Sequence, residues 1–431
     1  MPNRRLSARS TRLAALFLGA SLVLCVGSGS ARAQILATAT DPAVLLDSAR
    51  FYGGAEYLAW WVGGAPLSVP LISTGPIDGT HHGFLVNSES QILYGAPFAP
   101  ARGGNDVQEF QVASGTRLTL GVFLDDARRF ALEGSGFMVQ PRGAGYAIQA
   151  DQNGLPIINI PLFNTVPYAP PGRNGGGPPA EDGLPAALPL DLGRFDGNAG
   201  VFTGSVHITN TLQLWGADLT GVAKLYQSPS FELSGLAGFR VLGLSEAFGL
   251  VYQSVGVSGV YAGTSGRAFD SFKTTNRFYG ATIGLRGRYS YGPFSAELTG
   301  RLGLGVSDEV LTVTGGFYSA NYISPYRSGP EGVFAQPANE GRSASTHFAV
   351  VPELQAKIGY DVTPWMRLSL GYDLLYDSNV VRPGDQIDRN LPKGQTFNQG
   401  GVAPSTTSPT RLFRTTDFLA QGITLGVAFR F

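Results

Sequence analysis

Polar and apolar side chains alternate residue by residue through much of this chain, and this pattern limits the fold more than any other feature. From Phe294 to Leu304, apolar or small residues hold the even positions, while Ser295, Glu297 and others hold the odd ones. Successive side chains of a strand point to opposite faces, so each such segment has one apolar and one polar face. The pattern predicts an all-β protein with ten strands, at about 51–62, 115–124, 129–140, 203–226, 231–248, 275–289, 294–314, 345–362, 365–377 and 415–431.

The connections between these strands alternate between short and long. The short ones are expected at Asp125 to Arg128, Gln227 to Ser230, Ser290 to Pro293 and Thr363-Pro364, and the long ones near 63–114, 141–202, 249–274, 315–344 and 378–414. Long extracellular loops at one end and short periplasmic turns at the other are typical of outer-membrane barrels. We therefore expect a transmembrane antiparallel up-and-down β-barrel of about ten strands over residues 51–431, bound to the lipid of a bacterial outer membrane.

Backbone groups in lipid must all be hydrogen-bonded, which for strands means a closed barrel. An even number of strands leaves both termini on the periplasmic side. The last strand alternates through Val427 and Phe429 and ends on Phe431. A terminal aromatic residue on such a strand is similar to the signal that the bacterial barrel-assembly machinery recognises, so we expect that machinery as a partner.

The first residues have the features of a secretory signal. Arg4, Arg5, Arg9 and Arg12 precede an apolar stretch, and Ala31-Arg32-Ala33 offers a small-x-small cleavage site. We expect residues 1–33 to be removed and 34–50 to form a short periplasmic segment. Cleavage leaves 26 basic and 31 acidic residues, a net charge of −5 that argues against nucleic acid as a partner. It also removes Cys25, the only cysteine, and with it any disulfide or thiol chemistry.

The charged face of each strand is expected to line the lumen, because a charge at the middle of the lipid face costs about 2–4 kcal/mol. The expected lumen-lining residues are Glu133, Asp218, Lys224, Glu232, Arg240, Arg286, Arg288, Glu297, Arg301, Glu353, Lys357, Arg367, Asp373 and Arg430. Across the short turns, Arg286 should oppose Glu297 and Lys224 should oppose Glu232. These groups either fill a narrow lumen or set the ion preference of a small pore.

Aromatic residues cluster near both ends of the expected strands and suggest two membrane-interface girdles. Near the short turns these are Phe130, Tyr226, Phe231, Tyr289, Phe294, Tyr360, Trp365, Phe429 and Phe431; near the long loops they are Trp60, Trp61, Phe202, Phe248, Tyr279, Phe348, Tyr376 and Phe418.

Three segments carry a family resemblance: Phe51 to Trp61 (FYGGAEYLAWW), Leu236 to Leu242 (LAGFRVL) and Asn276 to Leu285 (NRFYGATIGL), together with the closing Phe431. They resemble the beta-barrel porin family of type seven, over nearly the whole mature chain. The resemblance implies an outer-membrane barrel with a porin-like role. It implies no catalytic residue.

Candidate chemistry beyond the barrel is sparse, and we expect no enzyme activity and no cofactor. The pair His81-His82 falls in a long loop, while His207 and His347 fall near strand tops; no serine or acid can be placed beside them by spacing, and adjacent loop histidines seldom converge on a metal. Gly300 to Gly305 is glycine-rich but lies within a strand, so it is no phosphate loop.

Three hypotheses therefore stay open: a porin-like or structural barrel, a rim-active hydrolase on the same barrel that would need His207 or His347, and a soluble periplasmic β-protein. Loop 141–202 is long enough to fold into the lumen. The oligomeric state is open.

Overall fold

The computed structural model describes residues 50–75, 85, 88–164, 185–189, 201–259, 262–320, 327–391 and 407–430. The expected signal at 1–33, nearly all of the expected periplasmic segment, His81-His82 and Phe431 lie outside these residues. Within them, strands dominate, with one short 3-10 helix, η2 (Pro383–Gln386). No helix of this part is long and apolar enough to cross a bilayer.

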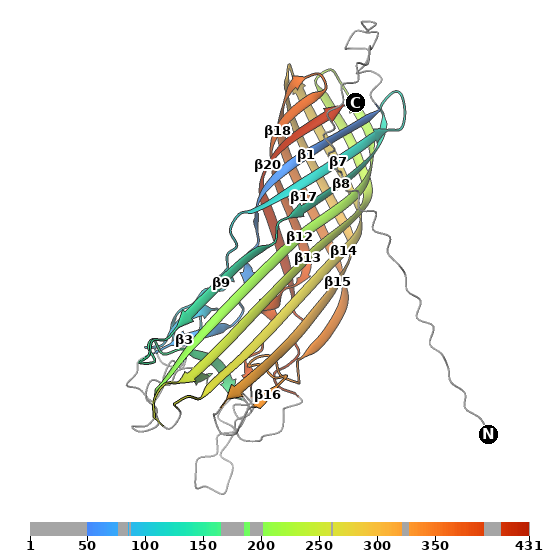
Figure 1. Ribbon diagram of the computed structural model, residues 1–431. Helices are drawn as coiled ribbons and strands as arrows, with labels where there is room; N and C mark the ends of the chain where they lie inside the picture. Colours follow the sequence, from blue (N-terminus) through green and yellow to red (C-terminus); the bar gives the residue numbers. More distant parts are fainter. Residues whose placement is uncertain are drawn as a thin grey trace, which may run out of the picture.

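Ten strands form a closed ring (Figure 1). They are β1 (Phe51–Val62), β7 (Ala113–Phe123), β8 (Phe130–Val139), β12 (Phe202–Gln227), β13 (Phe231–Gly256), β14 (Ser265–Tyr291), β15 (Phe294–Ala320), β17 (Gly341–Thr363), β18 (Met366–Val381) and β20 (Thr415–Arg430). Neighbours pair antiparallel around the ring, which closes where β1 pairs with β20. The expected ten-stranded up-and-down barrel is confirmed.

The four short connections all lie at one end of the ring, the upper end in Figure 1. The sequence-based placement of the turn after β14 is wrong by two residues, because Tyr291 rather than Tyr289 pairs with Phe294. Gly292 has a φ of 56°. Glycine adopts this left-handed conformation without strain, so a two-residue turn is enough to connect the strands.

The polarity of the two faces reverses along the longest strands. In the half of β14 near the short turn, Ile283 and Leu285 point outward and are exposed. In the half that begins at Ser265, outward positions include Lys273 and Arg277, while the inward Phe272 is fully buried. Apolar groups belong against hydrocarbon and polar groups against water. The half of β14 near Tyr291 therefore crosses the membrane, and the half that begins at Ser265 stands outside it.

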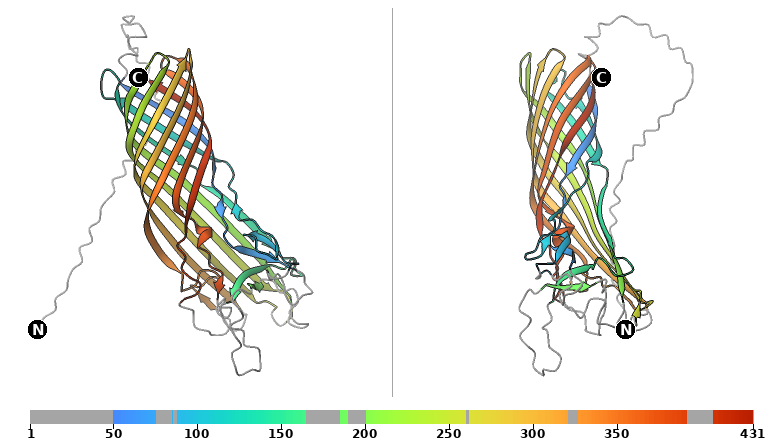
Figure 2. Two further views of the ribbon diagram at one scale, coloured as in Figure 1. Left: turned by 180° about the vertical axis from the view of Figure 1, so that it is seen from behind. Right: turned by 90° about the vertical axis from the view of Figure 1, so that its left-hand side faces the viewer.

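Outside the membrane, β12 to β15 continue as a curved sheet that reaches further than β1 and β7 (Figure 2). Strand β9 (Arg142–Gln149) extends this sheet beside β12. Short strands from the long connections complete the region: β2 (Ala65–Pro66), β3 (Pro70–Thr74), β4 (Gln91–Gly95), β5 (Arg102–Gly103), β6 (Val107–Gln108), β10 (Asn159–Asn164), β11 (Pro185–Pro189), β16 (Arg327–Gly329) and β19 (Asn390–Leu391).

These short strands and the long sheet share one hydrophobic core. Ile72, Ile160, Phe334 and Leu391 come from four of the five long connections and are buried with inward residues of the long strands, such as Phe272. The expected loops at 249–274 and 315–344 are consequently too long: β13 runs to residue 256, β14 starts at 265 and β15 runs to 320. The strands continue because they still have an apolar face to bury.

The girdle prediction is partly wrong at the long-loop end. Trp60, Phe202, Phe248 and Phe418 point inward and are buried, because they share the parity of the inward-facing residues on their strands. Outward at this level is Phe348, which is 65% exposed. At the short-turn end the outward rings are present, among them Phe130, Tyr226, Tyr289, Phe294 and Tyr360.

Candidate functional site

The membrane-spanning part of the lumen is filled by charged side chains. Among the described residues, six cations and six anions form one connected network of ion pairs: Arg117, Arg240, Arg286, Arg288, Arg301 and Lys357 with Glu56, Glu133, Asp218, Glu297, Glu353 and Asp373. Nine of the ten ring strands contribute to it. The charges balance, so the network crosses the lumen without excess charge.

Glu353 lies at the centre of this network. Arg240 bonds to one of its carboxylate oxygens, and guanidinium nitrogens of Arg117 and Arg301 lie 3.7 Å from its carboxylate. Its side chain is only 4% exposed. Because removing one partner leaves a buried charge uncompensated, such a deletion costs about 3–5 kcal/mol.

Glu133 forms the second node, nearer the short turns. Arg286 donates two hydrogen bonds to its carboxylate, at 2.9 and 3.0 Å, and Tyr52 donates a third at 3.2 Å. The expected cross-strand pair of Arg286 with Glu297 is wrong in register, because Arg288 lies opposite Glu297 and bonds to it at 2.5 and 2.9 Å. Arg286 still approaches Glu297 at 3.9 Å.

The other sequence-predicted residues lie closer to the periplasmic mouth. Lys224 forms an ion pair with Glu232 at 3.2 Å, although a bulge shifts the register so that Lys224 faces Ser234. Arg367 pairs with Asp361 through two bonds of 2.6 and 2.8 Å. Arg430 is exposed at the end of β20.

A vestibule of about 700 Å³ opens at this periplasmic end. Arg128, Trp365 and Arg430 line its mouth, and the network residues Arg301 and Glu353 line its floor. The vestibule therefore gives the periplasm access to the charge network.

An apolar layer lies on the extracellular side of the network. Leu58, Trp60, Leu244, Phe278 and Val351 belong to a second buried cluster contributed from all round the ring. The guanidinium group of Arg117 neighbours this layer, with its central carbon 5.6 Å from the centre of the Trp60 ring. Ions crossing the barrel would have to shed their water to pass such a layer.

The last residues of β18 and the chain that follows it, residues 379–391, fold inward and seal this end; we call this stretch the inner segment. Arg382 on this segment is buried and bonds to both carboxylate oxygens of Glu246 on β13, at 2.6 and 3.0 Å for the closest pairs. It also donates to the carbonyls of Gly63 and Gly64, at 3.2 and 2.7 Å. One guanidinium thus ties together three separate parts of the chain.

A second contact holds the inner segment to the opposite wall. The side-chain amide of Asn276 on β14 accepts from the backbone N–H of Val381 at 2.7 Å and donates to its carbonyl at 2.9 Å. Gln386 bonds in the same way to the backbone of Arg414, at 2.8 and 2.9 Å. Among the described residues, the stretch that closes the lumen is therefore 379–391, while β10 of the loop 141–202 contributes Ile160 to the extracellular core.

The two described histidines differ sharply in surroundings. His207 points outward from β12 and is exposed. His347 points inward from β17, where its Nδ1 lies 2.7 Å from a carboxylate oxygen of Glu309 and its Nε2 lies 3.3 Å from the hydroxyl of Ser345. No group of three His, Cys, Asp or Glu side chains suited to a metal ion occurs among the described residues.

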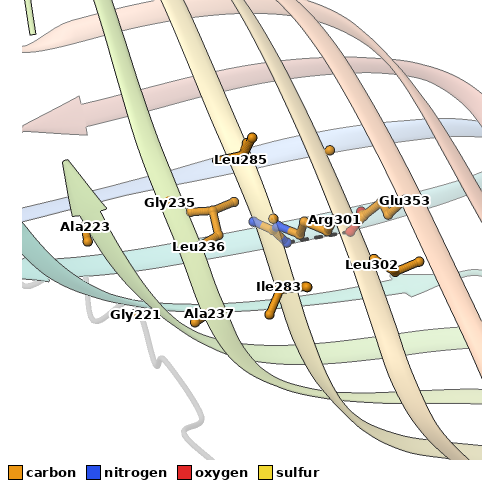
Figure 3. Close-up of a pocket in the computed structure, with 12 residues that line it drawn as sticks. Gly221, Ala223, Gly235, Leu236, Ala237, Ile283, Leu285, Arg301, Leu302 and Glu353 are labelled. Carbon is orange, nitrogen blue, oxygen red and sulfur yellow. Dashed lines mark ion pairs between the residues drawn. The ribbon is translucent and has the colours of Figure 1, made fainter. Parts of the chain in front are cut away.

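Glycine and alanine thin the wall of the barrel on its lipid-facing side. Figure 3 shows a groove over β12 to β15 where Gly221, Gly235 and Ala237 lie near Ile283 and Leu285. Behind these small residues lies the ion pair of Arg301 and Glu353 (Figure 3).

Sequence reasoning missed several residues of the lumen. Glu56 and Arg117 lie inside predicted strands, and the parity that assigned Arg240 and Glu353 to the lumen could have assigned these two as well. Glu246 also lies inside a predicted strand, but its ion pair with Arg382 and the contact of Asn276 with Val381 depend on how the chain around residue 382 folds, so the alternation did not predict them.

These features define an outer-membrane β-barrel whose lumen is filled by its own side chains and whose outer end is covered by a folded extracellular region. Residues 52–431 match the model of the family described as Putative beta barrel porin-7 (BBP7), and the chain belongs to that family. The expected resemblance is confirmed, and with it a porin-like barrel of the bacterial outer membrane.

Solved structures show weaker similarity. The outer membrane protease OmpT from Escherichia coli is 12% identical, with a TM-score of 0.40, over 89% of this chain and 97% of that chain. The monoaromatic hydrocarbon channel CymD is 7% identical, with a TM-score of 0.17, over 91% of both chains. The outer membrane channel DcaP of Acinetobacter baumannii is 10% identical, with a TM-score of 0.13, over 88% of this chain and 96% of that chain. None of these scores supports an argument about this chain. No curated protein matches it significantly.

Proposed function

We propose that this barrel is a porin-like passage that is closed at rest and admits small solutes only when the inner segment moves. The observation that carries this proposal is the buried Arg382, which ties the inner segment to Glu246 and to the chain just after β1. A purely structural barrel would need no vestibule of about 700 Å³ leading to its sealed layer.

The energetics favour a closed resting state. The inner segment contributes Val380 to the apolar layer and Ile387 to the extracellular core. Withdrawing it would expose both side chains and break the Arg382 contacts, so a spontaneous opening would be rare. Ordinary passive flow through a permanently open lumen is therefore not the mechanism that we propose.

Single-channel conductance in planar bilayers tests the proposal. The double variant Arg382→Met with Glu246→Gln removes the ion pair without leaving a buried charge unpaired. We expect few, brief openings for the wild type and a clear increase in open time for the double variant. Arg277→Met is a matched control, because Arg277 lies beside Asn276 on β14 but points outward.

Two outcomes would overturn this proposal. A double variant that is folded, judged by heat-modifiable migration, yet as silent as the wild type would leave a structural barrel as the function. Steady conductance by the wild-type protein would show that its lumen is open in the membrane.

We also propose that the vestibule charges set ion preference once the passage is open. Lys224, Arg288 and Glu297 line it, and charges along a narrow passage select ions of opposite sign. The sign of the preference is measured as a reversal potential across a salt gradient in the double variant.

Two expectations about biogenesis stay proposals. Phe429 and Val427 occupy the outward parity of β20, which supports recognition of this strand, through Phe431, by the barrel-assembly machinery. Deleting Phe431 should lower the amount of folded barrel in outer membranes. We propose further that residues 1–33 are removed, which N-terminal sequencing of the membrane-bound protein would test.

A further inference from the structure

The inward-facing group around His347 has the geometry of an activated nucleophile. His347 and Ser345 occupy alternate positions of β17, so both side chains lie on the same face. Glu309 lies directly opposite Ser345 on β15. The three side chains form a chain of contacts, with the Ser345 hydroxyl 3.3 Å from Nε2 of His347 and Nδ1 of His347 2.7 Å from the Glu309 carboxylate.

A hydrolytic centre needs a buried acid and an accessible nucleophile, and the exposure of the three side chains agrees with this requirement. The Glu309 side chain is fully buried, and His347 is 41% exposed. Ser345 is partly exposed. An inaccessible acid fixes the ring through Nδ1–H, which leaves Nε2 free to accept the serine proton. Burial raises the pKa of Glu309, while His347 opposes that shift, so the two groups depend on each other.

The edge of β17 beside Ser345 presents backbone N–H groups that no described strand pairs with, the type of donor that an oxyanion requires. Pairing with β18 begins at Glu353, so residues 341–352 have no strand partner on that side among the described residues. The N–H of Val350 points to that side, since it donates to the Ser378 hydroxyl at 2.8 Å. Backbone N–H groups alternate along a strand, so the N–H of Thr346 points there as well.

We propose that Ser345, His347 and Glu309 form a hydrolytic centre in the extracellular region, and that it cleaves carboxylic esters with an apolar acyl chain. The acyl preference follows from the surroundings: the ring of Phe413 lies 6.5 Å from that of His347. This activity is independent of the proposed gating.

The reaction balances with water as the only co-reactant. The Ser345 oxygen attacks the ester carbonyl carbon while Nε2 of His347 takes the hydroxyl proton. As the carbon–oxygen bond to the alcohol breaks, His347 gives that proton to the leaving oxygen, and the acyl group stays on Ser345. Water then attacks the acyl-serine, with His347 taking its proton and returning it to the serine oxygen. The products are one alcohol and one carboxylic acid.

The first test is ester turnover and covalent labelling by the folded protein in detergent. We expect hydrolysis of p-nitrophenyl butyrate and labelling of Ser345 by a fluorophosphonate, located by peptide mass spectrometry. Ser345→Ala and His347→Gln should each lower kcat at least about 100-fold and abolish the label, and Glu309→Gln should lower kcat about 10⁴-fold. Ser343→Ala, two residues away on the same face, and His207→Ala are the matched controls and should keep full activity.

A second readout does not depend on turnover. Cys25 is the only cysteine, so a Cys25→Ser background carrying Ser345→Cys has a single thiol. A neighbouring imidazole makes such a thiol more reactive. We expect the thiol of the Ser345→Cys variant to react with iodoacetamide at least about 10-fold faster than the thiol of a Ser343→Cys variant. This advantage should be lost when His347→Gln is added.

Two arms separate the sources of the ester. A soluble ester in micelles and a phospholipid in vesicles share the bond to be cleaved, and release of free fatty acid from the vesicles would assign a lipid substrate. A folded wild type that turns over neither ester and leaves Ser345 unlabelled would overturn the proposal, as would full activity in Ser345→Ala.

Discussion

The membrane-spanning and extracellular parts of this barrel are built from the same strands but in opposite ways. In the membrane, β14 turns Ile283 and Leu285 to lipid and Arg286 to the lumen. Outside, the same strand turns Lys273 to water and Phe272 to a dry core. Along β14 the alternation continues; what changes is the surroundings of both faces, from lipid outside and a charged lumen inside to water outside and an apolar core inside. The difference shows that the period of a pattern identifies a strand, whereas its polarity identifies what surrounds it.

The largest effect should come from the extracellular core. Phe272→Ala removes a fully buried ring and should lower the free energy of unfolding by about 3–5 kcal/mol. Phe269→Ala, three residues away but outward and 45% exposed, is the control and should cost less than about 1 kcal/mol. Denaturant titration of the purified barrel measures both. Equal effects would mean that the extracellular region has no soluble-type core.

The lipid face should show the next largest effect. Leu285→Arg places a charge against hydrocarbon and should destabilise the barrel by about 2–4 kcal/mol. Thr275→Arg, on the same outward face of β14 but beyond the reversal, should change stability by less than about 0.5 kcal/mol. Refolding titrations in phospholipid vesicles compare the two. If both arginines were tolerated, the reversal of polarity would not mark the membrane boundary.

A buried acid should make the extracellular part sensitive to pH. Burial raises the pKa of Asp270 to about 7, against hydrogen bonds from the backbone N–H groups of Ala335 and Phe334. Since the folded-state pKa lies above the ordinary value of 3.8, the contribution of Asp270 to stability is greatest at acidic pH and falls as the pH rises from that value towards 7. The slope can reach about 1.4 kcal/mol per pH unit.

Asp270→Asn keeps an acceptor oxygen and cannot ionise. Thermal unfolding measured across this pH range should therefore show a flatter profile for this variant than for the wild type. Asp308→Asn, an outward exposed acid on β15, is the control. A slope that is the same in all three proteins would remove Asp270 as its source.

The smallest effect concerns the vestibule. In the double variant that frees the inner segment, Glu297→Gln removes an anion from the vestibule wall and should shift the reversal potential towards anion preference. Asp308→Asn, which points outward, should leave the potential unchanged. An unchanged potential with Glu297→Gln would show that the vestibule charges only fill space.

Much of the fold could be predicted because, within the membrane, the outward face of every strand contacts lipid. Leu298 and Leu302 on β15 both face lipid, so the period-two pattern was enough to predict the ten strands and the sides of the connections. The register across the turn after β14 was missed because it depends on Gly292 and its left-handed backbone, which the alternation does not record.

The sites could be predicted only in part. Charges such as Arg240 and Glu353 could be assigned to the lumen by parity, but not to each other, because β14 and β15 lie between their strands in the ring and only closure of the barrel brings the two side chains together. The contacts of His347 depend on the register between β15 and β17, and those of Arg382 on a loop that follows no period. Spacing along one sequence carries neither kind of information.

The shared core outside the membrane has a consequence for assembly. Its apolar groups come from β12 to β15 and from four loops that include the one before the last strand, as at Leu391. In a partly inserted chain, the apolar inward faces of the extracellular parts of β12 to β15 are therefore exposed to water. The extracellular core can be completed only after the connection between β18 and β20 has folded. We therefore expect the extracellular region to form in a single late step of assembly.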